Sequence, residues 1–327
     1  MLLAADIGGT KTLIALFDRG PHRPIATVTR EYVTLDFESF EELVDTFIDE
    51  TGADHIEAVC AGVAGPITGQ VARLTNGSWF ADIAAVARRV GDCPATLAND
   101  LQAMAAAVPV LEPTEIRVLQ EGIAAPGGNA AILAAGTGMG QALLHNLNGQ
   151  FVPVASEGGH ADFAARTKRE IALVEELSRI YGRVEVERVL SGRGLVNLFR
   201  FTHGSQDLRT ACAEVGGELD ENEIAPAISA CALARRCEQC VEALQMFAEA
   251  YGAEAGNLGL RCMATAGVYV GGGIAPKILP ALEDGRFMDA FLSKDPMVDL
   301  LRTLPVRVIL NPAAGLLGAA ILASQLD

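Results

Sequence analysis

The sequence predicts a mixed α/β fold organised in two domains, and three observations lead to this prediction. Apolar, strand-like runs that end in Gly, Asp or Asn recur along the chain, as in LLAADIGG, IEAVCAGVAG and ATLAND. Segments with helical periodicity separate many of these runs. The chain has 327 residues, half of them hydrophobic, which is long enough for about two domains.

The first hundred residues predict a mixed sheet flanked by helices. Between two strand-like runs, the segment SFEELVDTFIDETG has the start and stop signals of a helix, with Ser39 as its N-cap and Gly52 at its end. Its apolar residues share one face at helical spacing: Phe40, Leu43, Val44, Phe47 and Ile48.

The rest of the chain repeats the strand and glycine pattern. Residues 131–145 follow the logic of the N-terminal unit, and AGVYVGGGIAPKILP predicts a strand, a triple glycine and a helix with Pro276 in its first turn. Three further stretches predict helices: 167–181, 186–202 and 223–264. The last segment, VRVILNPAAGLLGAAILASQ, resembles the first units. We therefore expect a small α/β lobe of residues 1–110 plus 305–327 and a large α/β lobe of residues 111–304 with added helices.

Charge and composition exclude several classes of protein. The chain has 25 Lys plus Arg against 41 Asp plus Glu, a net charge of −16, which argues against binding to nucleic acid or to an anionic membrane. The N-terminus MLLAAD has no positive segment and is interrupted early by Asp6, so it does not predict a signal peptide. Residues 122–144 carry no charge, but their glycines, Pro126 and polar amides make a poor membrane span. We expect a cytoplasmic protein.

The seven cysteines are mostly embedded in apolar segments, which is typical of reduced thiols in a cytosolic chain. Cys237 and Cys240, in CEQC, resemble half of a metal or redox motif. No second CxxC and no nearby CxxH completes a zinc site, and the segment has a helical pattern. Helix packing is therefore the favoured interpretation of this pair.

The segment DIGGTK follows an apolar strand and predicts a phosphate-binding loop. Gly8 and Gly9 tolerate positive φ, so the loop can turn tightly and direct its N–H groups at a phosphate. Thr10 adds a hydroxyl donor and Lys11 a positive charge. Asp6 at the strand end suits a hydrated Mg²⁺, which usually keeps several waters and takes few carboxylates. A plain glycine hairpin between two apolar runs is the alternative.

A second loop, AGTGMG, favours the phosphate interpretation. It contributes Gly136, Thr137 and Gly138 about 127 residues after the first loop, as a cleft between two similar lobes needs in order to hold a polyphosphate from both sides. Neither loop matches GxxxxGK[ST], so neither is a Walker P-loop. The triple glycine Gly271, Gly272 and Gly273 predicts close approach of a base or ribose, with helix–strand packing as the alternative.

Polar side chains at strand ends predict a ligand rich in hydroxyls. Asn99 and Asp100 end a strand before an apolar helix, where Asp100 could also serve as a helix cap. Glu157 and His160 flank a glycine pair in SEGGH, and Glu187 lies in EVERVLSG. Carboxylates accept hydrogen bonds, whereas amides and a neutral imidazole both donate and accept, so together they can recognise sugar hydroxyls.

The chain resembles the bacterial glucokinases of the actin, sugar kinase and Hsp70 ATPase superfamily from residue 3 to about 320. Nine motifs occur in order: DIGGTK, AGVAGP, LTNGSW, LAND, AAGTGMG, SEGGHADF, ERVLSGRGLVNLF, VGGGIAPK and NPAAGLLGAA. The pair SEGGHADF and ERVLSG is the most diagnostic and points to the hexokinase-like branch. The resemblance implies two ribonuclease H-like lobes around a central cleft that binds ATP–Mg²⁺ and glucose.

The resemblance also implies roles for individual residues. Asp100 is then the catalytic base for phosphorylation of the 6-hydroxyl of glucose, a reaction of glycolysis, and four residues bind sugar hydroxyls: Asn99, Glu157, His160 and Glu187. The resemblance further implies a homodimer. Two departures are visible: Leu101 stands where many relatives have a bulky aromatic, and the CxCGxxGC cluster of the related repressor and kinase branch is absent.

Other functions stay open at this point. The substrate could be another hexose such as mannose or fructose, and the phosphoryl donor could be polyphosphate, which such loops also grip. A sugar-sensing regulator is a different class, but no DNA-binding helix pair precedes DIGGT. An ATPase or polyphosphatase of the same superfamily would not need SEGGH or Glu187.

Overall fold

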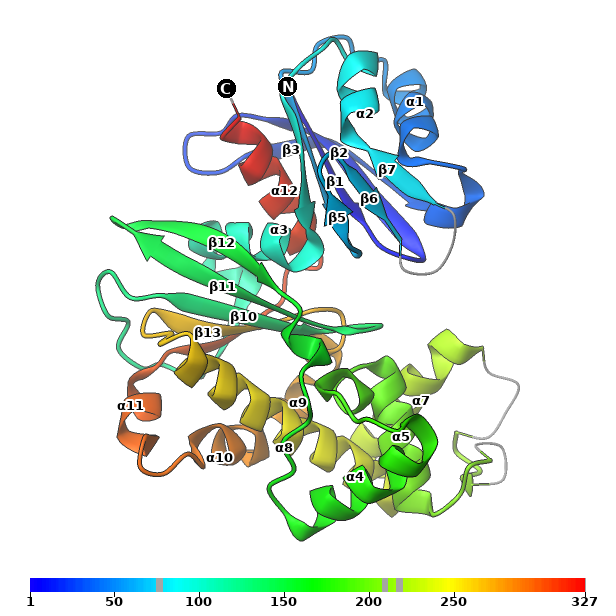
Figure 1. The fold of residues 1–327 in the computed structure, drawn as a ribbon, viewed down its shortest axis with the longest axis vertical. Helices are drawn as coiled ribbons and strands as arrows, with labels where there is room; N and C mark the ends of the chain where they lie inside the picture. Colours follow the sequence, from blue (N-terminus) through cyan, green and yellow to red (C-terminus); the bar gives the residue numbers. More distant parts are fainter. Residues whose placement is uncertain (75–78, 208–210, 216–219, 327) are drawn as a thin grey trace. The chain divides into compact units, whose positions relative to one another are not determined.

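The structure is a computed structural model that describes residues 1–326 except 75–78, 208–210 and 216–219 (Figure 1). The chain forms two compact units. The first comprises Met1–Pro113, Gln150–Ala155 and Asn311–Asp327, and the second comprises Thr114–Gly149 and Ser156–Leu310. This division differs from the expected lobe boundaries at residues 111–113, 150–155 and 305–310.

The first unit is built on a five-stranded mixed sheet with the order β3-β2-β1-β4-β8. Strand β1 is antiparallel to β2 and parallel to β4, and β4 is parallel to β8. The bounds of these strands are β1 Leu2–Ile7, β2 Lys11–Asp18, β3 Ile25–Val33, β4 Ala58–Val63 and β8 Ala95–Asn99. A smaller antiparallel sheet contains β5 Ile67–Thr68, β6 Val71–Arg73 and β7 Phe80–Asp82. Residues 75–78 of the LTNGSW motif lie outside the described residues.

Helices cover both faces of the five-stranded sheet (Figure 1). Side chains alternate along β1, so Leu3 packs toward one face with helices α1 (Phe40–Thr51) and α2 (Ile83–Arg89). Leu2 packs toward the other face in a cluster that includes residues of α3 (Asp100–Ala107) and α12 (Ala314–Ser324). The C-terminal helix thus completes the core of the first unit.

The predicted helix at residues 39–52 is confirmed as α1. The Ser39 side chain accepts a hydrogen bond from the N–H of Glu42, which makes it the N-cap. Gly52 ends the helix with a φ of 67°, in the left-handed region that favours glycine.

The second sheet has the order β12-β11-β10-β13-β14-β9. Strand β10 is antiparallel to β11 and parallel to β13, β13 is parallel to β14, and β14 is antiparallel to β9. The run β11-β10-β13-β14 therefore repeats the directions of β2-β1-β4-β8, which confirms the predicted repeat and the mixed α/β class. The strand bounds are β9 Ile116–Gln120, β10 Ala130–Ala135, β11 Met139–Leu147, β12 Gln150–Ser156, β13 Gly267–Gly271 and β14 Val306–Ile309.

Helix α8 is the central helix of the second unit, and α5, α7 and α10 pack against it. The α-helices that follow β12 are α4 Lys168–Tyr181, α5 Gly192–His203, α7 Glu221–Leu233, α8 Glu238–Arg261, α9 Leu279–Leu282, α10 Arg286–Leu292 and α11 Val298–Thr303. Short 3₁₀ turns complete the chain: η1 Thr34–Asp36, η2 Val108–Val110, η3 Pro113–Glu115, η4 Gly158–His160, η5 Val186–Arg188 and η6 Ala275–Ile278.

Two predicted helices are broken in the structure. The stretch 186–202 divides into η5 and α5, because Ser191 is extended and starts a new helix by accepting a hydrogen bond from Gly194 N–H. The stretch 223–264 divides into α7 and α8 between Ala234 and Cys237. Arg235 has a φ of 54° and Cys237 is extended, so the helix cannot continue through them.

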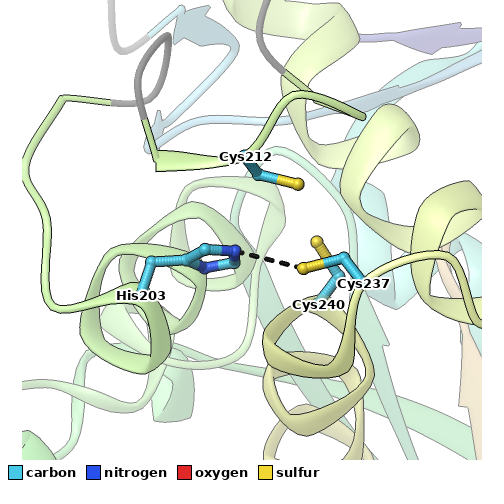
Figure 2. A group of neighbouring side chains, drawn as sticks. All are labelled: His203, Cys212, Cys237 and Cys240. Carbon is cyan, nitrogen blue, oxygen red and sulfur yellow. Dashed lines mark hydrogen bonds between the residues drawn. The ribbon is translucent and has the colours of Figure 1, made fainter.

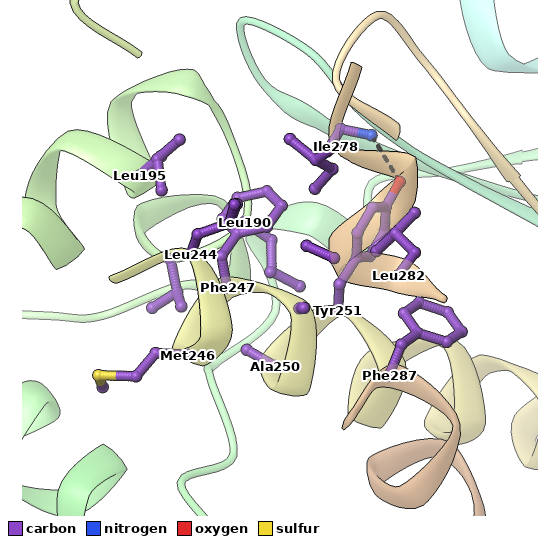
Figure 3. Close-up of a cluster of buried hydrophobic side chains, with 14 of the residues drawn as sticks. Leu190, Leu195, Leu244, Met246, Phe247, Ala250, Tyr251, Ile278, Leu282 and Phe287 are labelled. Carbon is purple, nitrogen blue, oxygen red and sulfur yellow. Dashed lines mark hydrogen bonds between the residues drawn. The ribbon is translucent and has the colours of Figure 1, made fainter. Parts of the chain in front are cut away.

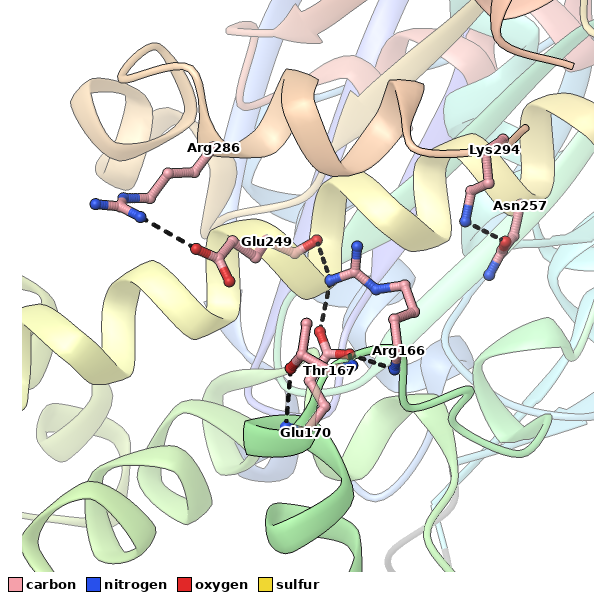
Figure 4. A network of polar contacts seen from close by, with 7 residues as sticks. All are labelled: Arg166, Thr167, Glu170, Glu249, Asn257, Arg286 and Lys294. Carbon is pink, nitrogen blue, oxygen red and sulfur yellow. Dashed lines mark hydrogen bonds and ion pairs between the residues drawn. The ribbon is translucent and has the colours of Figure 1, made fainter. Parts of the chain in front are cut away.

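Polar contacts fix the start of α4 and the end of α10 against α8 (Figure 4). Thr167 and Glu170 form a capping box, and the Glu170 carboxylate also accepts hydrogen bonds from Arg166 at 2.5 Å. Two residues after α10, Lys294 Nζ donates to Asn257 Oδ1 of α8 at 2.6 Å. Among the described residues, no helix combines the length and the apolar character needed to cross a membrane.

Candidate functional site

In the first unit, Asp6 lies near the carboxyl end of β1, and Asp100 follows the carboxyl end of β8, in the same sheet. Asp6 pairs in register with Gly62 on β4, and Asp100 directly follows β8. Burial, together with the negative charge of Asp100, raises the pKa of the Asp6 carboxyl to about 6, and Lys11 opposes this shift. The two predicted residues are therefore close enough to repel each other, which is the electrostatic setting that a bound cation relieves.

A glycine that the sequence reasoning missed makes room for Asp6. A Cβ on Gly315, in the first turn of α12, would lie 2.5 Å from Asp6 Oδ2. Gly315 belongs to the NPAAGLLGAA motif, about 300 residues away in the sequence, so only the fold relates the two positions. The small residue lets the start of the helix approach the carboxylate closely.

Asn99, rather than Asp100, is the N-cap of α3, so the alternative of Asp100 as the cap is wrong. The Asn99 Oδ1 accepts hydrogen bonds from the N–H groups of Leu101 at 3.0 Å and Gln102 at 3.4 Å. Asp100 is the first helical residue, and its Oδ1 lies 2.8 Å from the N–H of Leu101. The cap fixes the position of both side chains, and the amide nitrogen of Asn99 is a donor that the cap does not use.

The predicted loop at Gly8–Lys11 forms a tight turn, but not for the predicted reason. Neither Gly8 nor Gly9 has a positive φ. Gly8 is favoured by close approach instead, since its N–H donates to the carbonyl of Lys11 at 3.0 Å and an added Cβ would lie 3.0 Å from the same oxygen. A Cβ on Gly9 would meet nothing within 4 Å. Backbone at Gly9 is therefore open to a ligand.

Thr34 stabilises this loop by hydrogen bonds, a role that the sequence reasoning did not predict. Its hydroxyl donates to the carbonyl of Gly8 at 2.8 Å, and its N–H donates to the carbonyl of Thr10 at 3.1 Å. The Lys11 ammonium lies 2.8 Å from Glu31 Oε2, and the Lys11 side chain is 61% exposed. An exposed pair of this kind is weak, so Lys11 can exchange Glu31 for a phosphate at little cost.

In the second unit, the predicted loop Gly136–Gly138 contacts a predicted sugar-binding residue. The N–H of Met139 donates to Glu187 Oε2 at 2.9 Å, and a Cβ on Gly138 would lie 2.4 Å from that oxygen. The N–H of Gly192 donates to the carbonyl of Gly136 at 2.8 Å, and Thr137 between the two glycines is exposed. The structure thus brings the loop and Glu187 together.

The triple glycine lies beside the same loop. Gly272 has a φ of 84°, and a Cβ there would lie 2.4 Å from the carbonyl oxygen of Ala135. The N–H of Ile274 donates to that oxygen at 3.2 Å. Gly271–Gly273 and Gly136–Gly138 are therefore neighbours, as one nucleotide site requires, and Pro276 lies in the first turn of η6 as predicted.

Tyr251, a buried residue of α8, links the two glycine loops and was not predicted (Figure 3). Its hydroxyl accepts the N–H of Ala135 at 3.1 Å and lies 3.3 Å from the carbonyl oxygen of Gly271. Its ring packs edge-on against Phe247 and Phe287. Burial raises the pKa of this phenol, so it stays a neutral donor and acceptor.

Glu157 and His160 lie on either side of a glycine pair that packs on β11. A Cβ on Gly159 would lie 1.8 Å from the carbonyl oxygen of Met139, so only glycine fits there. His160 Nε2 lies 3.9 Å from Glu157 Oε2, and both side chains are mostly exposed. The second unit therefore contains three predicted sugar-binding residues, while Asn99 and Asp100 belong to the first unit.

The interpretation of Cys237 and Cys240 as packing residues is incomplete. Figure 2 shows that His203, at the end of α5, and Cys212 point toward the two thiols. Sequence spacing did not reveal this group, because His203 lies 34 residues and Cys212 lies 25 residues before Cys237.

The profile of the glucokinase family matches residues 3–326. The chain belongs to the glucokinase family. A glucokinase from Nostoc punctiforme is 38% identical over 339 aligned residues, which cover 100% of this chain and 99% of that relative. A glucokinase from Yersinia pestis is 35% identical over 317 residues, with 97% and 94% covered. The crystal structure of a glucokinase from an Antarctic psychrotroph has a TM-score of 0.85 at 28% identity and covers 99% of this chain and 98% of its own. The resemblance read from the nine motifs is confirmed.

Proposed function

We propose that this protein is an ATP-dependent glucokinase that transfers the γ-phosphoryl group of ATP to the 6-hydroxyl of glucose. The observation that carries the proposal is the match to glucokinases along the whole chain. Every site residue predicted from the motifs is among the described residues.

Asp100 is the proposed general base. Its carboxylate accepts the proton of the 6-hydroxyl as that oxygen attacks the γ-phosphorus, and such base assistance contributes roughly 10²–10⁴-fold to the rate. Correct placement of the hydroxyl and the phosphoryl group contributes more, about 7–11 kcal/mol. The N-cap at Asn99 supports this placement, because it fixes the first turn of α3 that carries Asp100.

Asp6 is the proposed residue for a hydrated Mg²⁺. Its raised pKa and its repulsion by Asp100 fit a site whose negative charge a cation would neutralise. When bound with ATP, the cation would neutralise part of the negative charge of the phosphates. Asp6 would hold the cation through water, and the loop Gly8–Lys11 would bind phosphate oxygens on the same edge of the sheet, through the amides of Gly9 and Thr10 and the ammonium group of Lys11.

The second unit supplies the remaining proposed contacts. Gly136–Gly138 binds phosphate, and Gly271–Gly273 binds the adenosine part of the nucleotide. Glu157, His160 and Glu187 bind sugar hydroxyls, with Asn99 as a further donor. Since Glu187 also accepts the N–H of Met139, directly after the phosphate loop, its position depends on that loop. This contact would couple sugar recognition to nucleotide binding.

Several further properties belong to the proposal. We propose that the two compact units act as two lobes that close on the substrates, since sugar-dependent closure would exclude water as a competing phosphoryl acceptor. We further propose a homodimer that acts in the cytoplasm as part of glycolysis. These proposals rest on the family and on the composition of the chain.

The test is initial-rate measurement of sugar phosphate formation with a panel of glucose, mannose and fructose, each with ATP or polyphosphate as donor. We expect glucose with ATP to give the highest kcat/KM. A higher kcat/KM with another hexose would identify that hexose as the substrate instead of glucose. A higher kcat/KM with polyphosphate would identify polyphosphate as the phosphoryl donor instead of ATP. Equal phosphate release with and without sugar would contradict the assignment of kinase activity and favour an ATPase.

A further inference from the structure

Four side chains in the second unit form a group with the composition of a metal site: His203, Cys212, Cys237 and Cys240 (Figure 2). Their ligand atoms all lie within 4.8 Å of one another. Cys212 and Cys240 are buried, while His203 and Cys237 are half-buried. All four residues are outside the kinase site described above.

The spacing of the ligand atoms is close to that of a tetrahedral zinc site. With Zn–S bonds of about 2.3 Å and a Zn–N bond of about 2.0–2.1 Å, neighbouring ligand atoms of a tetrahedron are about 3.5–3.8 Å apart. His203 Nε2 lies 3.4 Å from Cys237 Sγ. The other separations, which are at most 4.8 Å, need to shorten by no more than about 1.3 Å to reach this geometry. All seven cysteines are free thiols, so no disulfide competes for these sulfurs.

The tautomer of His203 also fits a metal ligand. Its Nδ1 lies 2.8 Å from the carbonyl oxygen of Phe199, which is only an acceptor, so Nδ1 carries the proton. In the neutral ring, the lone pair is then on Nε2, the nitrogen that faces Cys237. Metal-binding histidines almost always donate their other N–H to a carbonyl or carboxylate in this way. The ring also stacks on Phe199, with centroids 3.9 Å apart, which fixes its orientation.

We propose that His203, Cys212, Cys237 and Cys240 bind one Zn²⁺ ion. Three thiolates and one imidazole are the donors that this cation takes in four-coordinate sites. Four protein ligands leave no open position for water or substrate, so the ion is structural rather than catalytic.

The ion would join three segments that are separate in the sequence. His203 is the last residue of α5, Cys212 follows in the next segment, Cys237 is the N-cap of α8, and Cys240 lies in the first turn of α8. The other end of α5 begins at Gly192, whose N–H donates to the carbonyl of Gly136 in the phosphate loop. Zinc at one end of α5 would therefore stabilise a helix whose other end supports the kinase site.

The direct test is the metal content of the full-length protein, purified through a tag that contains no histidine and measured by plasma mass spectrometry. We expect about one zinc ion per chain, and a fall of at least about tenfold in Cys240→Ser and in His203→Gln. Cys262→Ser is the matched control, because Cys262 is a half-buried cysteine of the same unit outside the group. Cys231→Ser tests the ligand set, because Cys231 is a buried neighbour of Cys240 that is not one of the four ligands.

A second measurement does not require folded variants. Zinc-free wild-type protein titrated with Co²⁺ should develop thiolate-to-metal charge-transfer absorption and the visible bands of a tetrahedral complex, saturating at one equivalent. A zinc chelator should lower the Tm of the wild-type protein. Protein that contains no zinc and gives no tetrahedral Co²⁺ spectrum would overturn the proposal, as would a disulfide at Cys212, Cys237 or Cys240, mapped by peptide mass spectrometry after denaturation without reductant.

Discussion

Asp6 is a predicted site residue whose carboxyl pKa is shifted by burial. Its pKa rises from 3.8 to about 6, so the folded protein binds a proton at Asp6 more tightly than the unfolded chain does. The ionised form therefore costs free energy, and this cost is absent below about pH 4 and complete above about pH 6. The shift corresponds to about 3 kcal/mol at most.

We expect Asp6→Asn to stabilise the metal-free protein at pH 7.5 and to lose this advantage near pH 4. Thermal unfolding of both proteins across this range, in a buffer that chelates Mg²⁺, measures the difference. Asp18→Asn at an exposed strand end is the control, and it should show no such trend. A stabilisation that is the same at both pH values would show that burial of Asp6 is not the cause.

Tyr251 is a residue whose single hydroxyl connects two loops. Tyr251→Phe keeps the ring in its cluster but leaves the buried N–H of Ala135 without its partner. We expect a loss of about 1–3 kcal/mol in the free energy of unfolding and an increase in the KM for ATP, because both glycine loops lose their common support. Denaturant unfolding and initial rates check this, with the half-buried Tyr269→Phe as control. An unchanged KM would mean that the loops keep their positions without the hydroxyl.

At the scale of elements, the glycine turns differ in whether an added side chain would affect ligand binding alone or the stability of the fold as well. A Cβ on Gly9 meets nothing within 4 Å, whereas a Cβ on Gly272 lies 2.4 Å from the carbonyl oxygen of Ala135 at a φ of 84°. We expect Gly9→Ala to leave Tm unchanged and to raise the KM for ATP, since the methyl group occupies space that a phosphate needs. Gly272→Ala should lower Tm as well. If Gly9→Ala binds ATP as the wild type does, the backbone at Gly9 does not contact phosphate.

The sequence predicted those elements whose signals are local. Helix α1 has its cap, its apolar face and its terminal glycine within the 14 residues from Ser39 to Gly52. It forms as expected. The break between α7 and α8 was missed, because both sides have helical patterns and the left-handed Arg235 is not a glycine.

The candidate site, too, was predicted only where the sequence has a local signal. The motifs identified Asp6, Asp100 and the glycine loops by residue type, but not the residues that support them from a distance in sequence. Thr34 holds the first loop from 26 residues beyond Gly8, and Gly315 makes room for Asp6 from the last helix. Such contacts depend on the packing of elements, for which one sequence has no local signal.

At the scale of the whole molecule, the order of elements along the chain does not follow the two compact units. Helix α12 returns to the first unit, where its apolar residues pack with Leu2, Ala4 and Phe17. Removal of residues 311–327 should therefore expose one face of the first sheet and leave the core of the second unit intact. We expect faster amide exchange in β1 and β4 and little change in β10 and β13, by hydrogen-exchange mass spectrometry. Removal of Asp327 alone is the control, and equal protection of β1 in both truncations would contradict this packing.

The most direct measurement is ADP release from ATP with and without glucose, for the wild type and for Asp100→Asn. We expect turnover by the wild type to depend on glucose, and Asp100→Asn to lower kcat by roughly 10²–10⁴-fold while KM for ATP changes little. Asp18→Asn should behave as the wild type. An Asp100→Asn variant that keeps most of its glucose-dependent rate would contradict the assignment of Asp100 as the base.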